Sequence, residues 1–260
     1  MNDDIVAYIK NAIAKDLFDI HYQLQFSLVG VQFEATGAEA LLRPDTKVCH
    51  IEKLIRVAIR EGLIDELGYY IMRKTACQLR KVLDMQIVTS AFTMSVNVTA
   101  EQLQDKHFCS RVNDIVLDAE IDPAQLTIEL TEASMINDLD IAKIYQISST
   151  GVGVSIDDFG TGYSSLGRLK LLPINEIKID KTFVDDITKT EQDVALITAM
   201  YQLTQALNKF TVVEGVENTR QYEMLRDIGF TCFQGFYFAR PESPEDLAQT
   251  LILINSLHCQ

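Results

Sequence analysis

Short segments rich in β-branched residues alternate with longer amphipathic segments along most of this chain, and this alternation restricts the fold more than any other feature. We predict strands at 92–98, 125–130, 151–157, 174–180, 210–215 and 231–235. We predict helices at 51–67, 100–119, 138–148, 188–207, 218–228 and 243–257, with a short one beginning at Ser164. Strands that alternate with helices are typical of parallel strands joined by crossovers. About eight such units would close a barrel in a chain of this length.

The first two extended segments break the alternation. Segments 19–26 and 31–43 both have strand character, and the few residues between them leave no room for a helix. They therefore predict a hairpin. We expect an α/β fold of the modified (β/α)8 type, formed by a single domain over residues 1–260, with an open doubly wound sheet as the alternative.

The composition excludes some partners. With a formal net charge of −14, the protein should repel a nucleic-acid polymer, whereas a small anionic ligand remains possible where metal ions reverse the local charge. The five cysteines form no C-x-x-C pair, which favours a reducing compartment. The acidic start lacks the apolar core of a signal peptide, and no run of about 18 apolar residues predicts a membrane span. We therefore expect a cytoplasmic protein.

Each predicted strand ends on, or close to, a residue that can hold a metal or a phosphate. These residues are Asn97, Glu129, Asp157 with Asp158, Lys178, Glu214 and Gln234. A single acid at a strand end is most often a loop or cap residue, but chance explains six strand ends in succession poorly. The carboxyl ends of the strands of a β/α barrel meet at one mouth, where the active site lies. Side chains two apart share a face, so Asn97 lies with Ser95 and Glu129 with Thr127 on a polar inner face.

Several carboxylates at one mouth would repel each other and raise their own pKa values unless a cation neutralises them. Oxygen ligands from Asp, Glu and Asn suit Mg²⁺ or Mn²⁺. The four histidines show no H-x-x-x-H spacing, which argues against zinc. Adjacent Asp157 and Asp158 could serve two cations about 3.5–4 Å apart, the arrangement used for in-line cleavage of a phosphodiester.

Seven short motifs, in this order along the chain, resemble those of the EAL domain family. They are Glu39–Arg43 (EALLR), Ser95–Thr99, Glu129–Glu132, Asp157–Leu166, Lys178–Asp180, Glu214–Glu217 and Gln234–Phe236. The resemblance covers about residues 17–250 and is specific because all seven occur together. It implies a modified (β/α)8 barrel and hydrolysis of cyclic-di-GMP to linear pGpG with two Mg²⁺ or Mn²⁺ ions. It also implies a homodimer.

The resemblance also implies a role for each matched residue. One cation would be held by Glu39, Asn97, Glu129 and Asp157, and a second by Asp157, Asp158 and Glu214. Lys178 would orient or help to deprotonate the attacking water, and Gln234 would hold the water or a phosphate. Substrate would be contacted by Gln23, Leu42, Arg43 and Asn97. Three further acids would support the site: Asp180, Glu217 and Glu132, the last bracing the loop 131–137.

Two departures from the family concern the wall around the ligand. After Arg43 the family usually continues with Trp, then His-Pro and Gly, whereas this chain has the shorter segment Pro44–His50. Leu24 and Val213 replace a proline and an alanine. None of the implied metal ligands is lost, which favours an active phosphodiesterase over a non-catalytic cyclic-di-GMP receptor or a protein-docking module. An unrelated carboxylate–metal barrel enzyme of the enolase type is the third possibility.

Overall fold

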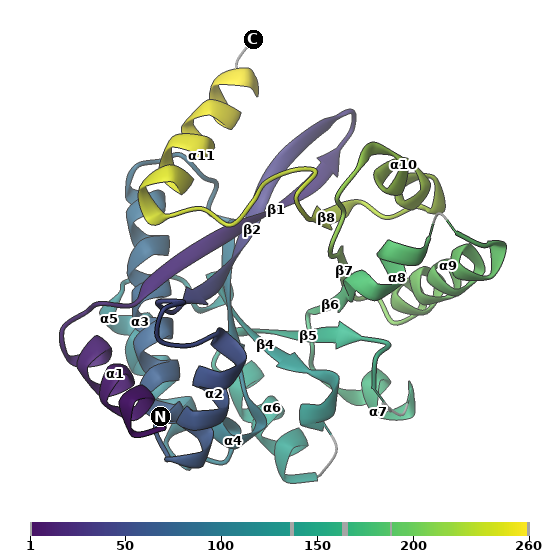
Figure 1. Ribbon diagram of the computed structural model, residues 1–260. Coiled ribbons are helices and arrows are strands. Elements are labelled where there is room, and N and C mark those ends of the chain that lie inside the picture. Colours follow the sequence, from purple (N-terminus) through teal and green to yellow (C-terminus); the bar gives the residue numbers. More distant parts are fainter. Residues whose placement is uncertain (1, 136–137, 163–165, 188, 259–260) are drawn as a thin grey trace.

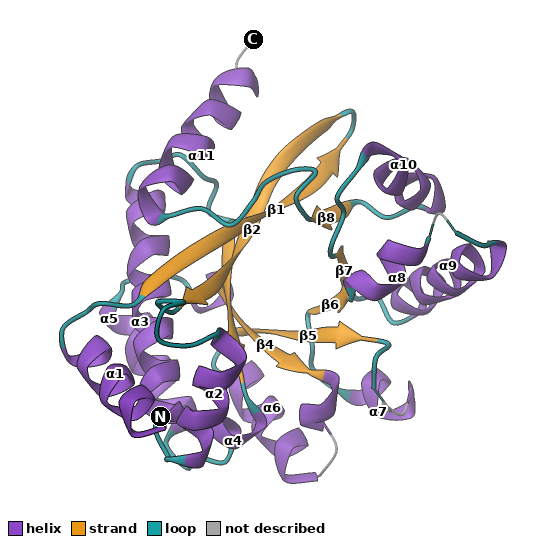
Figure 2. Ribbon diagram, viewed as in Figure 1, coloured by secondary structure: helices purple, strands orange, loops and turns teal. Residues whose placement is uncertain are grey.

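The computed structural model describes residues 2–135, 138–162, 166–187 and 189–258, and its centre is a closed barrel of eight strands, numbered around the ring in chain order (Figures 1 and 2). The strands are β1 Asp19–Val29, β2 Gln32–Arg43, β3 Thr93–Val98, β4 Leu126–Thr131, β5 Gly153–Phe159, β6 Glu176–Ile179, β7 Phe210–Val213 and β8 Cys232–Gln234. The predicted barrel is confirmed and the open sheet is wrong. Strand bounds differ from the prediction by a few residues, so Asp180 and Glu214 follow β6 and β7 directly.

The predicted hairpin is also confirmed. β1 pairs antiparallel with both β2 and β8, whereas the other neighbours are parallel. Gly30 makes the turn with φ of 65°, a left-handed conformation that favours glycine. Because β1 runs backwards, its first half lies at the same mouth as the carboxyl ends of the other strands: Asp19 pairs with Arg43, and Gln23 with Glu39.

The helices surround the ring of strands (Figure 2). They are α1 Asn2–Ala14, α2 Ile51–Arg60, α3 Ile64–Asp84, α4 Ala100–Leu103, α5 Phe108–Asp118, α6 Asp138–Ser149, α7 Leu166–Leu171, α8 Lys181–Asp186, α9 Glu191–Ala206, α10 Thr219–Ile228 and α11 Pro244–His258, with 3-10 turns at Pro123–Gln125 and Glu132–Met135. None of the described helices combines the length and the apolar character that crossing a membrane requires.

Several predicted helices need correction. The helix at 51–67 is two helices, because the chain turns at Gly62 with φ of 67°, and the second continues to Asp84. The helix at 100–119 is also two, since Asp105 Oδ1 accepts a hydrogen bond from His107 N and starts a new helix at Phe108. The helix at 188–207 begins only at Glu191. Neither α1 nor α8 was predicted, and the predicted start at Ser164 lies outside the described residues.

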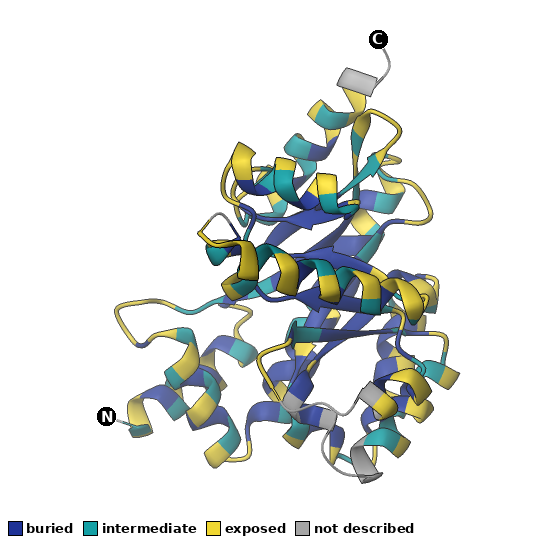
Figure 3. Cartoon of the chain, turned by 90° about the vertical axis from the view of Figure 1, so that its right-hand side faces the viewer, coloured by how far each residue is buried: buried dark blue, intermediate teal, exposed yellow. Residues whose placement is uncertain are grey.

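The barrel wall separates an apolar layer from a polar interior. Val96, Ile128 and Ile156 are buried on the side that the helices cover, and Figure 3 shows buried residues along the strands and exposed residues on the outer helix faces. The opposite faces of the same strands carry buried Ser95 and Ser155. The core that holds the fold together therefore lies between strands and helices, and the barrel interior is free to hold polar groups that pair with one another.

Candidate active site

The strand-end residues converge at the carboxyl mouth of the barrel, as predicted, and Lys178 lies at their centre. Its side chain is fully buried, and its Nζ lies 2.6 Å from Glu214 Oε1, 2.8 Å from Glu129 Oε2, 3.1 Å from Glu39 Oε2 and 3.4 Å from Asp157 Oδ1. Burial alone would lower the pKa of Lys178, but the carboxylates, Glu129 first, raise it well above the usual value. The side chain is therefore an ammonium. One ammonium faces four carboxyl groups, too little positive charge for all four to ionise without a further cation.

Glu39 is held from three sides. Its Oε1 accepts a hydrogen bond from Asn97 Nδ2 at 2.7 Å, and its Oε2 accepts from Gln234 Nε2 at 2.7 Å and from Lys178. Burial would raise the pKa of this carboxyl, but Lys178 and the two amide donors outweigh burial and lower the pKa below its ordinary value. Glu39 is thus kept ionised and fixed in orientation, as a metal ligand must be.

One carboxylate oxygen of Glu129 is buried without a hydrogen-bond partner among the described residues. The side chain is fully buried, and its Oε1 has no hydrogen-bond partner in the described parts of the chain. Burial, and then repulsion from Glu39, raises the pKa of Glu129 well above its ordinary value. A buried carboxylate oxygen left without a partner is costly, so the atom is well suited to a ligand that supplies positive charge.

A second group of acids lies beside the first. One carboxylate oxygen each from Asp157, Asp158 and Glu214 can be chosen so that all three lie within 4.8 Å of one another. Burial, followed by repulsion from Asp157, raises the pKa of Asp158 to about 6, and burial, only partly offset by Lys178, raises the pKa of Glu214 to about 8. Asp158 has φ of 54°, a conformation that costs energy for any residue except glycine. The oxygen-only donors fit a hard divalent cation such as Mg²⁺ or Mn²⁺.

The three predicted supporting acids lie in different places. Glu132 Oε2 accepts hydrogen bonds from the backbone N–H of Gly160 and Gly162, both at 3.1 Å, and so joins the turn after β4 to the loop after β5. Asp180 caps α8 by accepting from Thr182 N at 3.0 Å. Glu217 is exposed at the rim. Of the loop 131–137, positions 136 and 137 lie outside the described residues.

A cavity of about 270 Å³ opens on this acidic centre. Gln23 and Gln234 line it, with Gln23 Nε2 donating to Ala239 O at 3.2 Å. Its lining also includes three residues for which no role was predicted: Leu41 and Phe236, which lie within matched motifs, and Lys181. Leu41 lies two residues after Glu39 on the same face of β2, so strand parity could have identified it. No signal in the sequence marks Lys181 as part of this wall.

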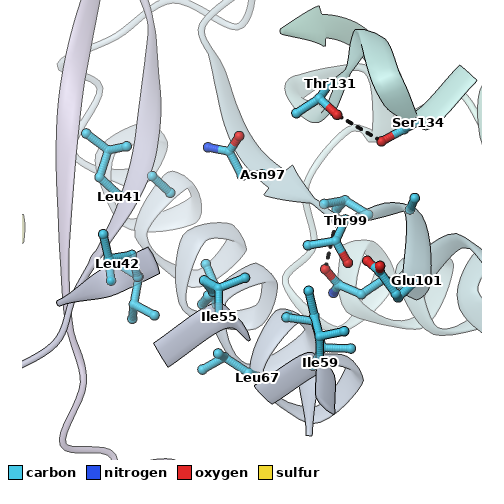
Figure 4. Close-up of a pocket in the computed structure, with 18 of the residues that line it drawn as sticks. Leu41, Leu42, Ile55, Ile59, Leu67, Asn97, Thr99, Glu101, Thr131 and Ser134 are labelled. Carbon is cyan, nitrogen blue, oxygen red and sulfur yellow. Dashed lines mark hydrogen bonds between the residues drawn. The ribbon is translucent and has the colours of Figure 1, made fainter. Parts of the chain in front are cut away.

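Leu42 and Arg43 lie beside a neighbouring, larger cavity of about 540 Å³. Figure 4 shows Leu42, Ile55, Ile59 and Leu67 along this apolar hollow, with Asn97 at its edge. Asn97 also donates to Glu39 and so joins the hollow to the acidic centre. Arg43 is partly exposed, and its Nη1 lies 3.4 Å from Leu42 O. The structure therefore places these two predicted substrate contacts next to the metal candidates but not among them.

The segment 44–50, which departs from the family pattern, is held by a helix that the sequence did not predict. Asp45 N donates to the hydroxyl of Tyr8, on α1, at 2.9 Å. Asp45 Oδ1 in turn accepts from Lys47 N at 2.9 Å. The shortened loop is therefore anchored at its start.

Comparison with known proteins places this geometry in a family. A family model described as the EAL domain matches residues 7–241. Signaling protein YkoW of Bacillus subtilis (strain 168) is 35% identical over 257 residues, covering 97% of this chain and 31% of that protein. Cyclic di-GMP phosphodiesterase PdeR of Escherichia coli (strain K12) is 33% identical over 252 residues, covering 93% of this chain and 37% of that protein. The chain thus spans about a third of the length of these two relatives. A solved complex of the PaMucR phosphodiesterase with c-di-GMP is similar with a TM-score of 0.85 at 32% identity, covering 94% of this chain and 99% of that one.

Proposed function

This chain belongs to the EAL domain family, and on that premise we propose that it hydrolyses one phosphodiester bond of cyclic-di-GMP to give linear pGpG. The observation that carries the proposal is the acidic centre around Lys178, where four carboxylates share one ammonium. The choice of substrate is supported by PdeR, which is named a cyclic di-GMP phosphodiesterase, and by the PaMucR phosphodiesterase, which was solved as a c-di-GMP complex.

The residues at the mouth fit two divalent cations, Mg²⁺ or Mn²⁺. One would be held by Glu39, Asn97, Glu129 and Asp157, and the second by Asp157, Asp158 and Glu214. The unpartnered Glu129 Oε1 supports the first group, and the mutual closeness of the three acids supports the second. When bound, the cations would neutralise the carboxylates, lower the pKa of the attacking water and stabilise the leaving oxygen.

The side chains around the cations would orient the reactants. Lys178 keeps its proton among the carboxylates and acts as a charged donor that orients the water. Gln234 acts through Glu39, because Gln234 Nε2 donates to that carboxylate while Gln234 Oε1 accepts from Gln25 at 3.0 Å. Both ends of the Gln234 amide are therefore hydrogen-bonded: the nitrogen holds Glu39, and the bond from Gln25 to the oxygen fixes the amide in that orientation.

Substrate binding would use the rim between the two cavities. Gln23 lines the acidic cavity, and Arg43 shares the β2 face of Glu39, from which its guanidinium can pair with a phosphate as a forked donor. Leu42 contributes to the apolar wall beside it. Glu132, Asp180 and Glu217 would support the loops around this rim.

The activity assay is incubation of the purified chain with cyclic-di-GMP and Mg²⁺ or Mn²⁺, with the products separated by chromatography. Glu39→Gln removes a ligand charge at constant size, and Glu34→Gln makes the same change at an exposed position of the same strand. We expect pGpG from the wild type and from Glu34→Gln. We expect none from Glu39→Gln or in the presence of a chelator.

Other results would lead to other conclusions. Hydrolysis that survives the chelator would refute the metal-dependent mechanism. Binding of cyclic-di-GMP without turnover would make the chain a receptor, and neither binding nor turnover would favour a protein-docking role.

We also propose that the active form is a homodimer, on the basis of the family resemblance. Light scattering of the purified chain tests this directly, and a monomeric mass at assay concentrations would contradict it.

A further inference from the structure

A polar cavity of about 340 Å³ opens at the end of the barrel opposite the acidic centre. The first residues of the parallel strands line it, among them Thr93, Thr127, Glu176 and Phe210, together with Gln25 from the reversed strand β1. The proposed hydrolysis places no substrate and no cation at this end. The amino-terminal mouth of a β/α barrel ordinarily contributes to stability and is packed, so a hollow there calls for an explanation.

The described residues that line this cavity are rich in hydrogen-bond acceptors and include no Lys, Arg or His. Among the described residues that line it, Glu176 is the charged one. Its carboxylate accepts a hydrogen bond from Ser155 Oγ at 2.8 Å, and no ion pair joins it to any residue that the structure describes. Burial raises the pKa of Glu176, and the hydrogen bond from Ser155 and the charge of Lys178 offset burial only in part. A cationic group in the cavity would supply further positive charge.

Two glycines keep the acceptor atoms uncovered. A Cβ at position 153 would lie 2.8 Å from Thr127 Oγ1, and a Cβ at position 37 would lie 2.8 Å from Gln25 Oε1. Any larger residue at Gly153 or Gly37 would cover a polar atom of the barrel interior. At the rim, Phe210 is 48% exposed and offers an aromatic face beside the carboxylate. A carboxylate, hydroxyls and an aromatic ring together are typical of a site for an ammonium or guanidinium group.

A hydrogen-bond chain through the barrel explains why Gln25 turns an acceptor toward the cavity. Glu39 accepts only, so Gln234 must present its NH₂ to Glu39 and its oxygen to Gln25. Gln25 therefore donates its own NH₂ to Gln234 Oε1, which leaves Gln25 Oε1 on the side of Thr93 and the polar cavity. The carboxylate of Glu39 at one mouth thus determines that Gln25 turns its oxygen, and not its NH₂ group, toward the other mouth.

We propose that this cavity is a second binding site, which takes a small organic cation carrying a primary ammonium or guanidinium group. The cation pairs with Glu176, donates to Thr127 and Gln25, and lies against the ring of Phe210. The volume of the cavity suits a short amine rather than a nucleotide. The amine binds there without the substrate or the cations of the opposite mouth.

The test is calorimetric titration of the purified chain with agmatine, which carries an ammonium and a guanidinium. Saturating Mg²⁺ is present so that the acids of the opposite mouth do not bind the probe. We expect saturable binding that Glu176→Gln weakens about tenfold or more, because it removes a charge-assisted hydrogen bond. Phe210→Leu should weaken binding less. Glu66→Gln, at an exposed position in the first turn of α3, away from this cavity, should leave it unchanged.

Two results would overturn the proposal. One is the absence of saturable heat with the wild type. The other is an equal loss in Glu66→Gln, which would show attraction to the net charge of −14 and not to the cavity. Thr127→Val removes the hydroxyl at constant side-chain size and should also weaken agmatine binding. The unfolding temperature of each variant without agmatine shows that its fold is intact, so a loss of binding in Glu176→Gln or Thr127→Val can be assigned to the cavity.

Discussion

Replacing Lys178 by methionine tests how the acidic centre is held together. The substitution keeps an unbranched side chain of similar length but removes the ammonium that Glu39, Glu129, Asp157 and Glu214 share at 2.6–3.4 Å. Removing one partner of a buried ion pair costs about 3–5 kcal/mol. We expect the upper half of that range, because four carboxylates lose the same cation.

The size of the effect should depend on divalent cations. At about 2–4 °C per kcal/mol for a chain of this size, Lys178→Met should lower the unfolding temperature by about 8–20 °C in a chelator. With excess Mg²⁺ the loss should be much smaller, because cations that bind only the folded state replace the missing charge and stabilise it. Thermal unfolding followed by circular dichroism in both buffers measures this difference directly.

Lys181→Met is the matched control. Lys181 lines the cavity that opens on the acidic centre but is exposed, so its loss should change stability by no more than about 0.5 kcal/mol. The reasoning is refuted if Lys178→Met unfolds like the wild type in the chelator, or if Mg²⁺ restores none of its lost stability.

Three further predictions concern the same mouth. The pKa of Glu214 rises from 4.5 to about 8 on folding, so the stability that Glu214 contributes is complete below about pH 4.5 and is lost as the pH rises through about 8. Without divalent cations, the unfolding temperature should therefore fall between about pH 6 and pH 9. A rise over this range would contradict the prediction. Gly215→Ala should cost about 2–4 kcal/mol, measured by urea unfolding, because φ is 69° and the new Cβ would lie 2.3 Å from Lys181 Cβ. Gly30→Ala, with similar φ but open space, should cost only about 1–2 kcal/mol, and equal losses would refute the steric argument. Glu132→Ala should lower kcat/KM by about tenfold or more, because both loop amides lose their acceptor. Glu132→Gln keeps an acceptor oxygen for these amides and should retain most of the activity. Similar losses in both variants would show that the negative charge of Glu132 matters instead.

The strand ends could be predicted from the sequence because strand parity is a local rule. Asn97 and Glu129 alternate with apolar residues over only a few positions, and the barrel then brings them together. The hairpin of β1 and β2 could be predicted for the same reason, since the gap between the strands is too short for a helix.

Other parts depend on contacts that no local pattern encodes. The break at 104–107 arises because Asp105 accepts from both His107 N and the hydroxyl of Tyr69, which lies on a different helix. The link from Gln25 to Gln234 joins residues 209 positions apart. The apolar hollow beside Arg43 likewise needs α3, whose aromatic residues and Gly68 obscure its helical periodicity.

The reversed strand also governs when the site comes into being during folding. The barrel closes only when β1 pairs with β8, 209 positions later, through Gln25 opposite Gln234. Pairings so distant in sequence are slow, since the entropy of a long loop must be lost first. Glu39 lies on one side of this seam and Gln234 on the other, so the metal ligand receives its last hydrogen bond only when the ring is complete. A nascent chain therefore cannot assemble the acidic mouth before β8 has been synthesised.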